Sequence, residues 1–366
     1  MGLATIGKTE KGHLMGKVQR MTTTVKDLVM GAGAVAVGIA TTETLAGGPP
    51  STELSYVLPE ARSAVVFALP LDQDAIEAFL KKEEMAAANR DNRRVNTMAS
   101  GIALELAEYL NMKNLAAVPV TANAVYRKDV PFGPYAEMPP ISHRYLAVRS
   151  GIGYFGLSGN VILDGYGAAV ILGSVVTAAE LIPTEALPPE DAYCDGCRLC
   201  MAACASGLMD RDEKVTVTMG GVEFSYARRK IYSRCDYVCG GFTGLHPSGK
   251  WSTWSPARFP IPETDEEFLP ALMETVEPYR KRPKQDFGCN TYHPLTPGNR
   301  LEFTCGHCQY ICHPDPKIRK ARYRMVTGNG VVIQLEDGSL KAVSPEEADT
   351  HLAAMGRDVR ALYQKR

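Results

Sequence analysis

The segment YCDGCRLCMAACASGLM, residues 193–209, carries four closely spaced cysteines. Gaps of two, two and three residues separate Cys194, Cys197, Cys200 and Cys204. This spacing is typical of the ferredoxin-type run that holds a [4Fe–4S] cluster, in which the fourth cysteine often binds a second cluster. Farther along, the segment CGHCQYIC adds Cys305, Cys308 and Cys312. Together the two groups are expected to complete two four-thiolate shells.

The crossover known from two-cluster ferredoxins predicts which cysteines share a cluster. The first cluster is expected to be held by Cys194, Cys197, Cys200 and Cys312. The second is expected to be held by one further cysteine together with Cys204, Cys305 and Cys308. The candidates for that further position are Cys235, Cys239 and Cys289. The alternatives are a structural zinc site, which usually shows paired two-residue gaps, and disulfides, which suit short secreted chains.

Composition limits the class of protein. A chain of 366 residues is long enough for two or three domains. All ten cysteines lie after residue 193, and this clustering favours a metal site over a disulfide framework. The net charge of −1 argues against a large nucleic-acid-binding surface. Because we find no secretory leader and no apolar run of about 20 residues, we expect a cytoplasmic protein without membrane contact.

Buried apolar runs alternate with helical patterns in the first half of the chain, which is typical of the α/β (α+β) class. We expect an N-terminal arm at 1–21, an α/β domain at 22–185, a cysteine-rich domain at 186–320 with an insert at 210–304, and a C-terminal hairpin and helix at 321–366. In the first domain we expect helices at 74–82 and 93–111 and strands at 34–40, 116–120, 160–163 and 168–176. Residues 58–72 are expected to form a loop that leads into a fully buried strand. The last helix is expected at 345–363.

Two features of the middle of the chain allow alternative interpretations. The segment GIGYFGLSGNVILDGYGAAV, residues 151–170, is rich in glycine, so its backbone is expected to pack closely against another part of the chain or against a large ligand. The insert holds an aromatic group that either covers a substrate pocket or forms a small core, and we favour the core. This group consists of Phe242, Trp251, Trp254 and Phe259.

The cysteine pattern, combined with HRYLAVRSGIGYFGLSGNVILDGYGAAVILGSVVT at 143–177, resembles the cobalamin-dependent reductases. This superfamily includes reductive dehalogenases and epoxyqueuosine reductases. The segments AVAVGIATTETL and VLPEARSAVVFALPL look like the opening of the same family, and the resemblance covers most of residues 22–320. It implies a nitroreductase-like domain that holds a base-off corrinoid (cobalamin), followed by a ferredoxin-like domain with two [4Fe–4S] clusters.

The resemblance also implies residue roles. The corrinoid would be bound by the helix and glycine turn through His143, Gly151, Gly153, Tyr154, Gly156, Leu157, Ser158, Gly159, Asn160, Tyr166 and Gly167. The family places the last ligand of the second cluster in an Arg-Cys segment, which here matches Arg234-Cys235. Cys235 is therefore the first choice, Cys239 the second and Cys289 the third.

The predicted catalytic residues lie near the start of the same helix. Epoxyqueuosine reductases carry a catalytic acid there, and Glu137 stands at the matching position. Desolvation in a closed pocket raises the pKa of a carboxyl and lets it donate a proton, whereas a solvated loop glutamate is the alternative. Further candidates, with packing or ion pairing as their alternative roles, are Tyr135, Arg144 and Tyr145. Leu157 replaces the basic residue of the family's glycine turn, which argues against the chemistry of either known branch.

These features favour a cytoplasmic oxidoreductase resembling the reductive dehalogenases. Ferredoxin or flavodoxin would supply electrons through the clusters to cobalamin, which would reduce a small electrophilic molecule. The mild charge and the missing C-terminal helical repeats argue against a nucleic acid substrate. Two alternatives stay open: an iron–sulfur electron-transfer protein without corrinoid, and an epoxyqueuosine reductase-like tRNA-modifying enzyme. The sequence leaves a homodimer open.

Overall fold

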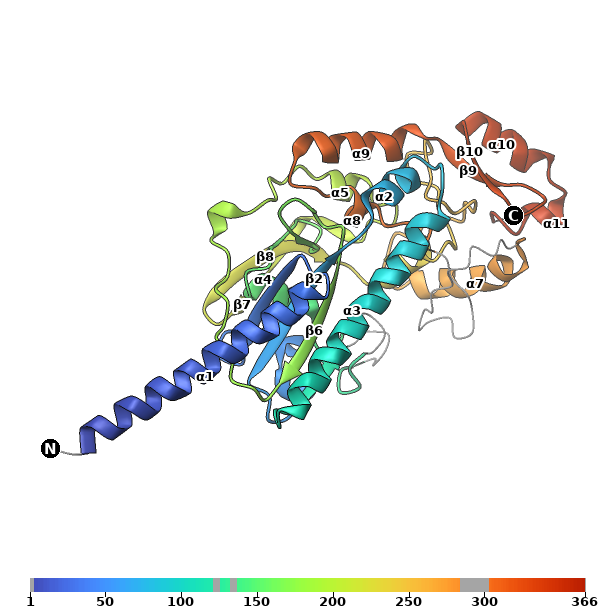
Figure 1. Ribbon diagram of the computed structural model, residues 1–366. Coiled ribbons are helices and arrows are strands. Elements are labelled where there is room, and N and C mark those ends of the chain that lie inside the picture. The colour runs from blue at the N-terminus through green and yellow to red at the C-terminus, as the bar shows by residue number, and fades with distance from the viewer. Residues whose placement is uncertain (1–2, 121–125, 132–136, 284–302, 366) are drawn as a thin grey trace.

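A computed structural model of the chain describes residues 3–120, 126–131, 137–283 and 303–365. Its central element is a four-stranded sheet in the order β1-β2-β6-β3 (Figure 1). The strands are β1 (Ala36–Thr41), β2 (Ser63–Pro70), β6 (Val170–Thr177) and β3 (Ala117–Val120). The predicted mixture of helices and strands is confirmed. Every pairing in this sheet is antiparallel, which the alternation of elements along the sequence did not reveal.

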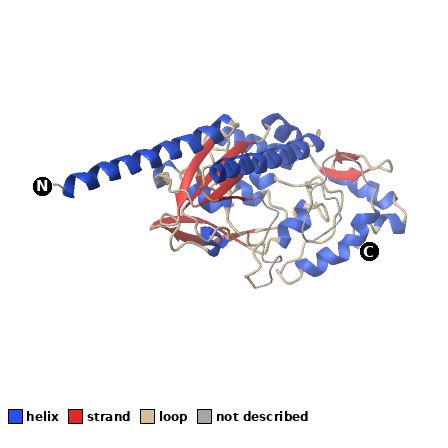
Figure 2. Cartoon of the chain, turned by 60° about the horizontal axis from the view of Figure 1, so that its bottom comes forward, coloured by secondary structure: helices blue, strands red, loops and turns tan. Residues whose placement is uncertain are grey.

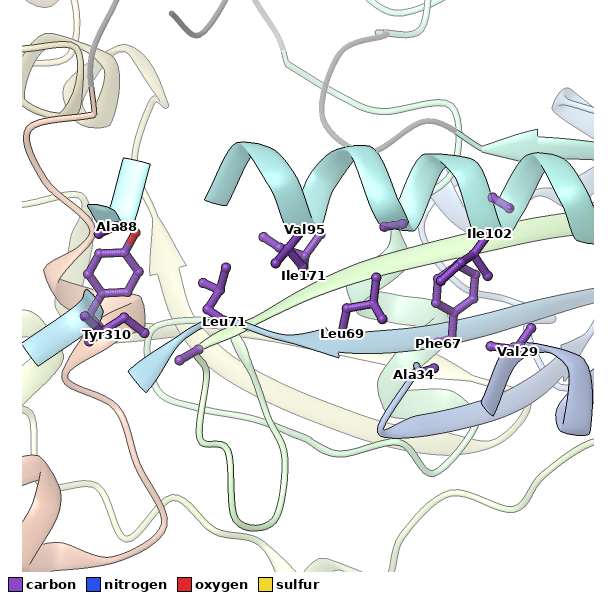
Figure 3. Packing of buried hydrophobic residues seen from close by; sticks show 14 of the residues in the cluster. Val29, Ala34, Phe67, Leu69, Leu71, Ala88, Val95, Ile102, Ile171 and Tyr310 are labelled. Carbon is purple, nitrogen blue, oxygen red and sulfur yellow. The ribbon is translucent and has the colours of Figure 1, made fainter. Parts of the chain in front are cut away.

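The sheet is the middle of three layers, because its inner strand β2 is buried on both faces. Val65, Phe67 and Leu69 of β2 belong to one core cluster, together with residues of α1 (Leu3–Gly31) and α3 (Ala86–Met112). Figure 3 shows Val95 and Ile102 of α3 over this face. The alternate residues of β2 belong to a second cluster with α4 (His143–Arg149). The sheet therefore fixes the position of α4, the helix with the predicted site residues.

Helix α1 includes residues 3–21, most of the stretch where an N-terminal arm was expected. It is a continuous helix whose last part packs Val25 and Val29 against the sheet. Figures 1 and 2 both show its first part projecting away from the body. The helical form of residues 3–21 was not predicted, because this stretch is polar and lacks a clear apolar period, although it has no proline to interrupt a helix. Nowhere in the described ranges is a helix both long and apolar enough to cross a bilayer.

The remaining elements surround the cysteine groups. The glycine segment forms β4 (Tyr154–Phe155) and β5 (Val161–Ile162). Sequence reasoning missed a long hairpin after the first cysteine run, consisting of β7 (Met209–Met219) and β8 (Val222–Arg229). The other elements are α2 (Gln73–Leu80), α5 (Leu199–Ala202), α6 (Ser233–Cys239), α7 (Phe268–Lys281), α8 (His307–Tyr310), α9 (Pro316–Gly328), β9 (Val331–Gln334), β10 (Leu340–Val343), α10 (Pro345–Ala354) and α11 (Arg357–Arg360). The expected helix at 345–363 is thus interrupted between α10 and α11.

The aromatic residues of the insert form core, as favoured above. Phe242 and Phe259 pack in a small cluster of their own, and both tryptophans join the main core. The indole Nε1 of Trp254 donates a hydrogen bond to the Phe79 carbonyl oxygen at 2.9 Å. The main core therefore contains residues from both sides of the domain boundary expected at residue 185, and the four-part division stays a prediction.

Candidate iron–sulfur site and active site

The first cysteine run folds as a loop that ends in the one-turn helix α5. Arg198 adopts a left-handed conformation, with φ of 60°, directly before that helix. The amide of Cys197 donates to the Asp195 carboxylate at 3.2 Å. Cys197 is exposed and Cys200 is buried, so the run reaches from the surface into the interior.

The thiols predicted for the first cluster are neighbours. Burial raises the pKa of Cys200 to about 12, with contributions from the nearby thiols of Cys308, Cys194 and Cys197. Burial also raises the pKa of Cys312, and Cys200, Cys194 and Cys197 add to this shift. The thiols of Cys194, Cys197, Cys200 and Cys312 are therefore close enough to influence one another, and the crossover assignment stays a prediction.

The second set of thiols meets beside the first. Burial raises the pKa of Cys308 to about 12, with Cys204 and Cys235 as the nearest thiols. Cys305 has Cys235, Cys308 and Cys204 as its neighbours. Cys239 lies one helical turn after Cys235 in α6, and its Sγ lies 3.6 Å from the Cys305 carbonyl oxygen. The Cys235 thiol lies within hydrogen-bond reach of the Cys239 thiol, so both stay candidates for the last ligand, and Cys289 falls outside the described residues.

The donor sets suit iron–sulfur clusters by number and type. Each set offers four thiols from two or three separate segments, which is the ligand set of a [4Fe–4S] cluster. In the part of the chain that the structure describes, no three Cys, His, Asp or Glu side chains are grouped tightly enough for one metal ion. The two clusters and the individual ligand assignments stay predictions.

The glycine turn packs against other parts of the chain. A Cβ atom on Gly153 would lie 2.4 Å from the Ile162 carbonyl oxygen, and one on Gly167 would lie 2.2 Å from the Cys312 carbonyl oxygen. At Gly151 the nearest atom would be the Glu185 carbonyl oxygen, also at 2.2 Å. Of the two explanations for these glycines, close chain packing holds at these positions. The corrinoid stays a prediction of the resemblance.

Other residues predicted to bind the corrinoid also contact protein. His143 is buried, with its Nδ1 2.8 Å from the Ser174 hydroxyl. The buried Tyr154 ring lies edge-on to Tyr193, with 6.3 Å between centroids. A Cβ atom on Gly156 would meet Ile162, and one on Gly159 would meet Arg229, Tyr226 and Arg144. The Ser158 hydroxyl accepts from the Asn160 backbone amide, the Asn160 side chain contacts Arg229 and Cys308, and Tyr166 packs against the second core cluster.

Leu157 lies between the glycine turn and the cysteines. Its amide donates to the Cys194 Sγ at 3.3 Å. Its side chain packs in a small apolar cluster that includes Cys200, Cys204 and Cys308. The leucine therefore contributes an apolar wall to the cysteine sites, where a basic side chain was expected from the resemblance. An apolar contact here keeps water and its screening away from the thiols.

Arg144 and Tyr145 lie in a polar group that joins α4 to the missed hairpin. Arg144 Nη2 donates to the Tyr232 hydroxyl at 3.3 Å, and the hydroxyls of Tyr145 and Tyr226 lie 2.6 Å apart. Arg229, at the end of β8, donates to the same Tyr232 hydroxyl at 2.9 Å. Although burial opposes ionisation, Arg229 and Arg144 hold the pKa of Tyr232 below its usual value.

Glu137 lies beside this group and is not a freely solvated loop residue. Its backbone adopts a left-handed conformation with φ of 49°, and its side chain is half-buried. Burial raises its pKa to about 9, and the charge and a hydrogen bond of Asp236 add to the shift. Burial and the carboxylates of Glu137 and Asp236 also raise the pKa of Tyr126. Sequence reasoning missed Asp236, which follows Cys235 directly, and Tyr135 falls outside the described residues.

Comparison with known proteins finds sequence relatives that share the name epoxyqueuosine reductase. No family model matches the chain. An epoxyqueuosine reductase of Synechocystis sp. is 25% identical over 207 residues, covering 56% of this chain and 61% of the relative. An epoxyqueuosine reductase of Atelocyanobacterium thalassa is 37% identical over 70 residues, covering 19% of this chain and 22% of the relative. The chain is a relative of the cobalamin-dependent reductases.

The relationship agrees with the resemblance read from the sequence and with the prediction of an oxidoreductase, because these relatives are reductases by name. This chain spans about three-fifths of the first relative's length, 61%. Among solved structures, a reductive dehalogenase gives a TM-score of 0.47 at 16% identity, covering 70% of this chain and 34% of that one. An epoxyqueuosine reductase from Bacillus subtilis gives 0.39 at 17% identity, covering 85% and 77%. The sequence relatives therefore carry the assignment.

One prediction is contradicted. We expected a small-molecule substrate and no nucleic acid partner. The sequence relatives are named for a modified nucleoside, and one solved epoxyqueuosine reductase holds an epoxyqueuosine-modified tRNA-Tyr stem loop; it is 17% identical, with a TM-score of 0.38 over 62% of this chain and 59% of that one. The prediction failed because net charge averages over the whole surface and does not report the charge of one face.

Proposed function

We propose that this chain is a two-cluster iron–sulfur reductase of the epoxyqueuosine reductase type, acting on a modified nucleoside carried by tRNA. The proposal rests on two groups of neighbouring thiols and on the half-buried acid Glu137, which lies against Asp236, the residue after Cys235. The sequence relationship to epoxyqueuosine reductases supports the choice of substrate class.

The electron count suits two clusters. Removing an epoxide oxygen as water takes two electrons and two protons. A [4Fe–4S] cluster transfers electrons singly, so two neighbouring clusters supply the pair. Cys197 is exposed and gives the first cluster a route to an external donor, while Cys308 adjoins Asn160 and the polar group inside. We therefore place electron entry at the first cluster and delivery at the second.

The proton-donating side chains near the cysteines suit the same reaction. With a pKa of about 9, Glu137 holds its proton at neutral pH and is able to donate it to a leaving oxygen. Asp236 lies against it, so ionisation of Glu137 would place two carboxylates side by side in a half-buried site. This repulsion favours rapid return of the proton after each turnover. Tyr232, with its pKa lowered beside two arginines, is the candidate for the second proton.

The resemblance also implies a bound corrinoid. In the superfamily that the sequence resembles, the corrinoid performs the reduction, but in the described glycine turn Gly151, Gly153 and Gly167 pack against the chain itself. We therefore assign no step to that cofactor. Gel filtration after anaerobic incubation with hydroxocobalamin measures directly whether the chain retains it, and this measurement does not depend on turnover.

The test of the function uses the whole chain. The protein is reconstituted anaerobically with iron and sulfide and reduced with titanium(III) citrate. It is then incubated with an epoxyqueuosine-containing tRNA stem loop, with and without cobalamin. We expect nucleoside mass spectrometry to show the loss of one oxygen atom, and Cys308→Ser to abolish it. A preparation with about eight irons per chain that leaves the nucleoside unchanged in both arms would contradict the proposal.

A further inference from the structure

Two arginines from different segments share one tyrosine hydroxyl beside the second cysteine set. Arg144 reaches Tyr232 from α4, and Arg229 reaches it from the end of β8. Backbone carbonyls hold both guanidinium groups in place. Arg144 Nη1 donates to the Gly159 oxygen at 2.6 Å, and Arg229 Nε donates to the Ser158 oxygen at 2.9 Å. The glycine turn thus positions two positive charges.

The arginines connect directly to a cysteine. Arg229 Nη2 donates to the Asn160 side-chain oxygen at 2.8 Å. The amide nitrogen of Asn160 lies 3.8 Å from the Cys308 Sγ and points its donor at that sulfur. One chain of hydrogen bonds therefore joins a buried cation to a predicted cluster ligand.

These charges lack the partners that arginines usually have. Across the described ranges, no Asp or Glu forms an ion pair with Arg144 or Arg229. The neighbouring Arg228 differs, because it pairs with Asp210 at 3.1 Å and with Glu213 at 2.5 Å. A guanidinium without a carboxylate keeps its full field, and in a low-dielectric site that field acts on nearby charges with little screening.

We propose that Arg144, Arg229 and Asn160 raise the reduction potential of the second cluster. The inference rests on the proposed function only in requiring that Cys204, Cys235, Cys305 and Cys308 hold a cluster. Reduction adds one negative charge to the cluster, and hydrogen bonds and cations near the sulfurs stabilise it. A higher potential of the second cluster favours electron transfer to it from the first cluster, which includes the exposed Cys197. The three residues are positioning residues that act through the cluster.

The test is a redox titration of the reconstituted protein followed by EPR spectroscopy. Arg229→Gln removes one charge while keeping a hydrogen-bonding side chain. We expect the potential of one cluster to fall by at least about 59 mV, a tenfold change in a one-electron equilibrium, while the other cluster changes much less. Arg228→Gln is the matched control. It removes the same charge from the neighbouring residue, where two carboxylates already neutralise it. It should leave both potentials unchanged.

A second pair of variants keeps the inference testable if Arg229→Gln loses iron. Asn160→Asp replaces the amide donor by a carboxylate of equal size and should lower the same potential, and Arg144→Gln should do so to a smaller extent. Full iron content with both potentials unchanged in these variants would overturn the inference. Iron near zero in the unchanged protein would instead refute the cluster assignment on which the proposed function rests.

Discussion

The contact between Gly167 and Cys312 offers the sharpest test of how the α/β part supports the first cluster. Gly167 has φ of 66°, and the nitrogen of the next residue, Ala168, donates to the Cys312 carbonyl oxygen at 3.1 Å. A Cβ atom on Gly167 would lie 2.2 Å from that oxygen, well inside the 3.0 Å that real Cβ contacts respect. Gly167→Ala must therefore displace the backbone of a predicted cluster ligand.

The chain offers a matched control two residues away. Gly165 has φ of 69°, and a Cβ atom there would meet nothing within 4 Å. Both alanine variants bear the left-handed backbone cost of about 1–2 kcal/mol. Only Gly167→Ala adds the clash. The comparison between the two variants thus isolates the contact with Cys312 from backbone strain.

The assay is iron content after anaerobic reconstitution, together with thermal unfolding of the loaded protein. We expect Gly165→Ala to keep about eight irons per chain and to lose only a few degrees of Tm. We expect Gly167→Ala to fall toward about four irons, because the first cluster loses the ligand geometry at Cys312. Equal iron content and equal Tm in the two variants would refute the reasoning that this turn braces the ligand.

Three further predictions concern the acid, the last ligand and the core. Glu137→Gln should lower the single-turnover rate by about 10²–10⁴-fold, and the rate of the unchanged protein should fall as pH rises through about 9, where Glu137 loses its proton; a flat profile to pH 10 would exclude it as the acid. Cys235→Ser should halve the iron content while Cys239→Ser leaves it unchanged, and the reverse pattern would exchange their roles. Trp254→Phe should cost about 1–3 kcal/mol of stability, because the buried Phe79 carbonyl loses its donor; an unchanged Tm would contradict this.

The local sequence predicted the parts of this protein that depend on spacing. Thiols two residues apart converge wherever the chain turns tightly, so spacing alone predicts the cysteine sets, and their assignment to clusters stays a prediction. The unbroken apolar run of β2 predicted a strand covered on both faces, and the first core cluster and the second cover those faces. The resemblance to cobalamin-dependent reductases was likewise carried by short motifs, and sequence relatives support it.

Only the tertiary structure decided which distant residues meet. Asp236 lies against Glu137, and Arg229 shares Tyr232 with Arg144, because the β7–β8 hairpin and α6 fold back onto α4. No local pattern marks such contacts, since each residue alone looks like an ordinary surface charge. The glycines of the turn show the same limit. Sequence revealed that their backbone needs close approach, but whether a ligand or the chain fills that space depends on the packing of segments far apart in sequence.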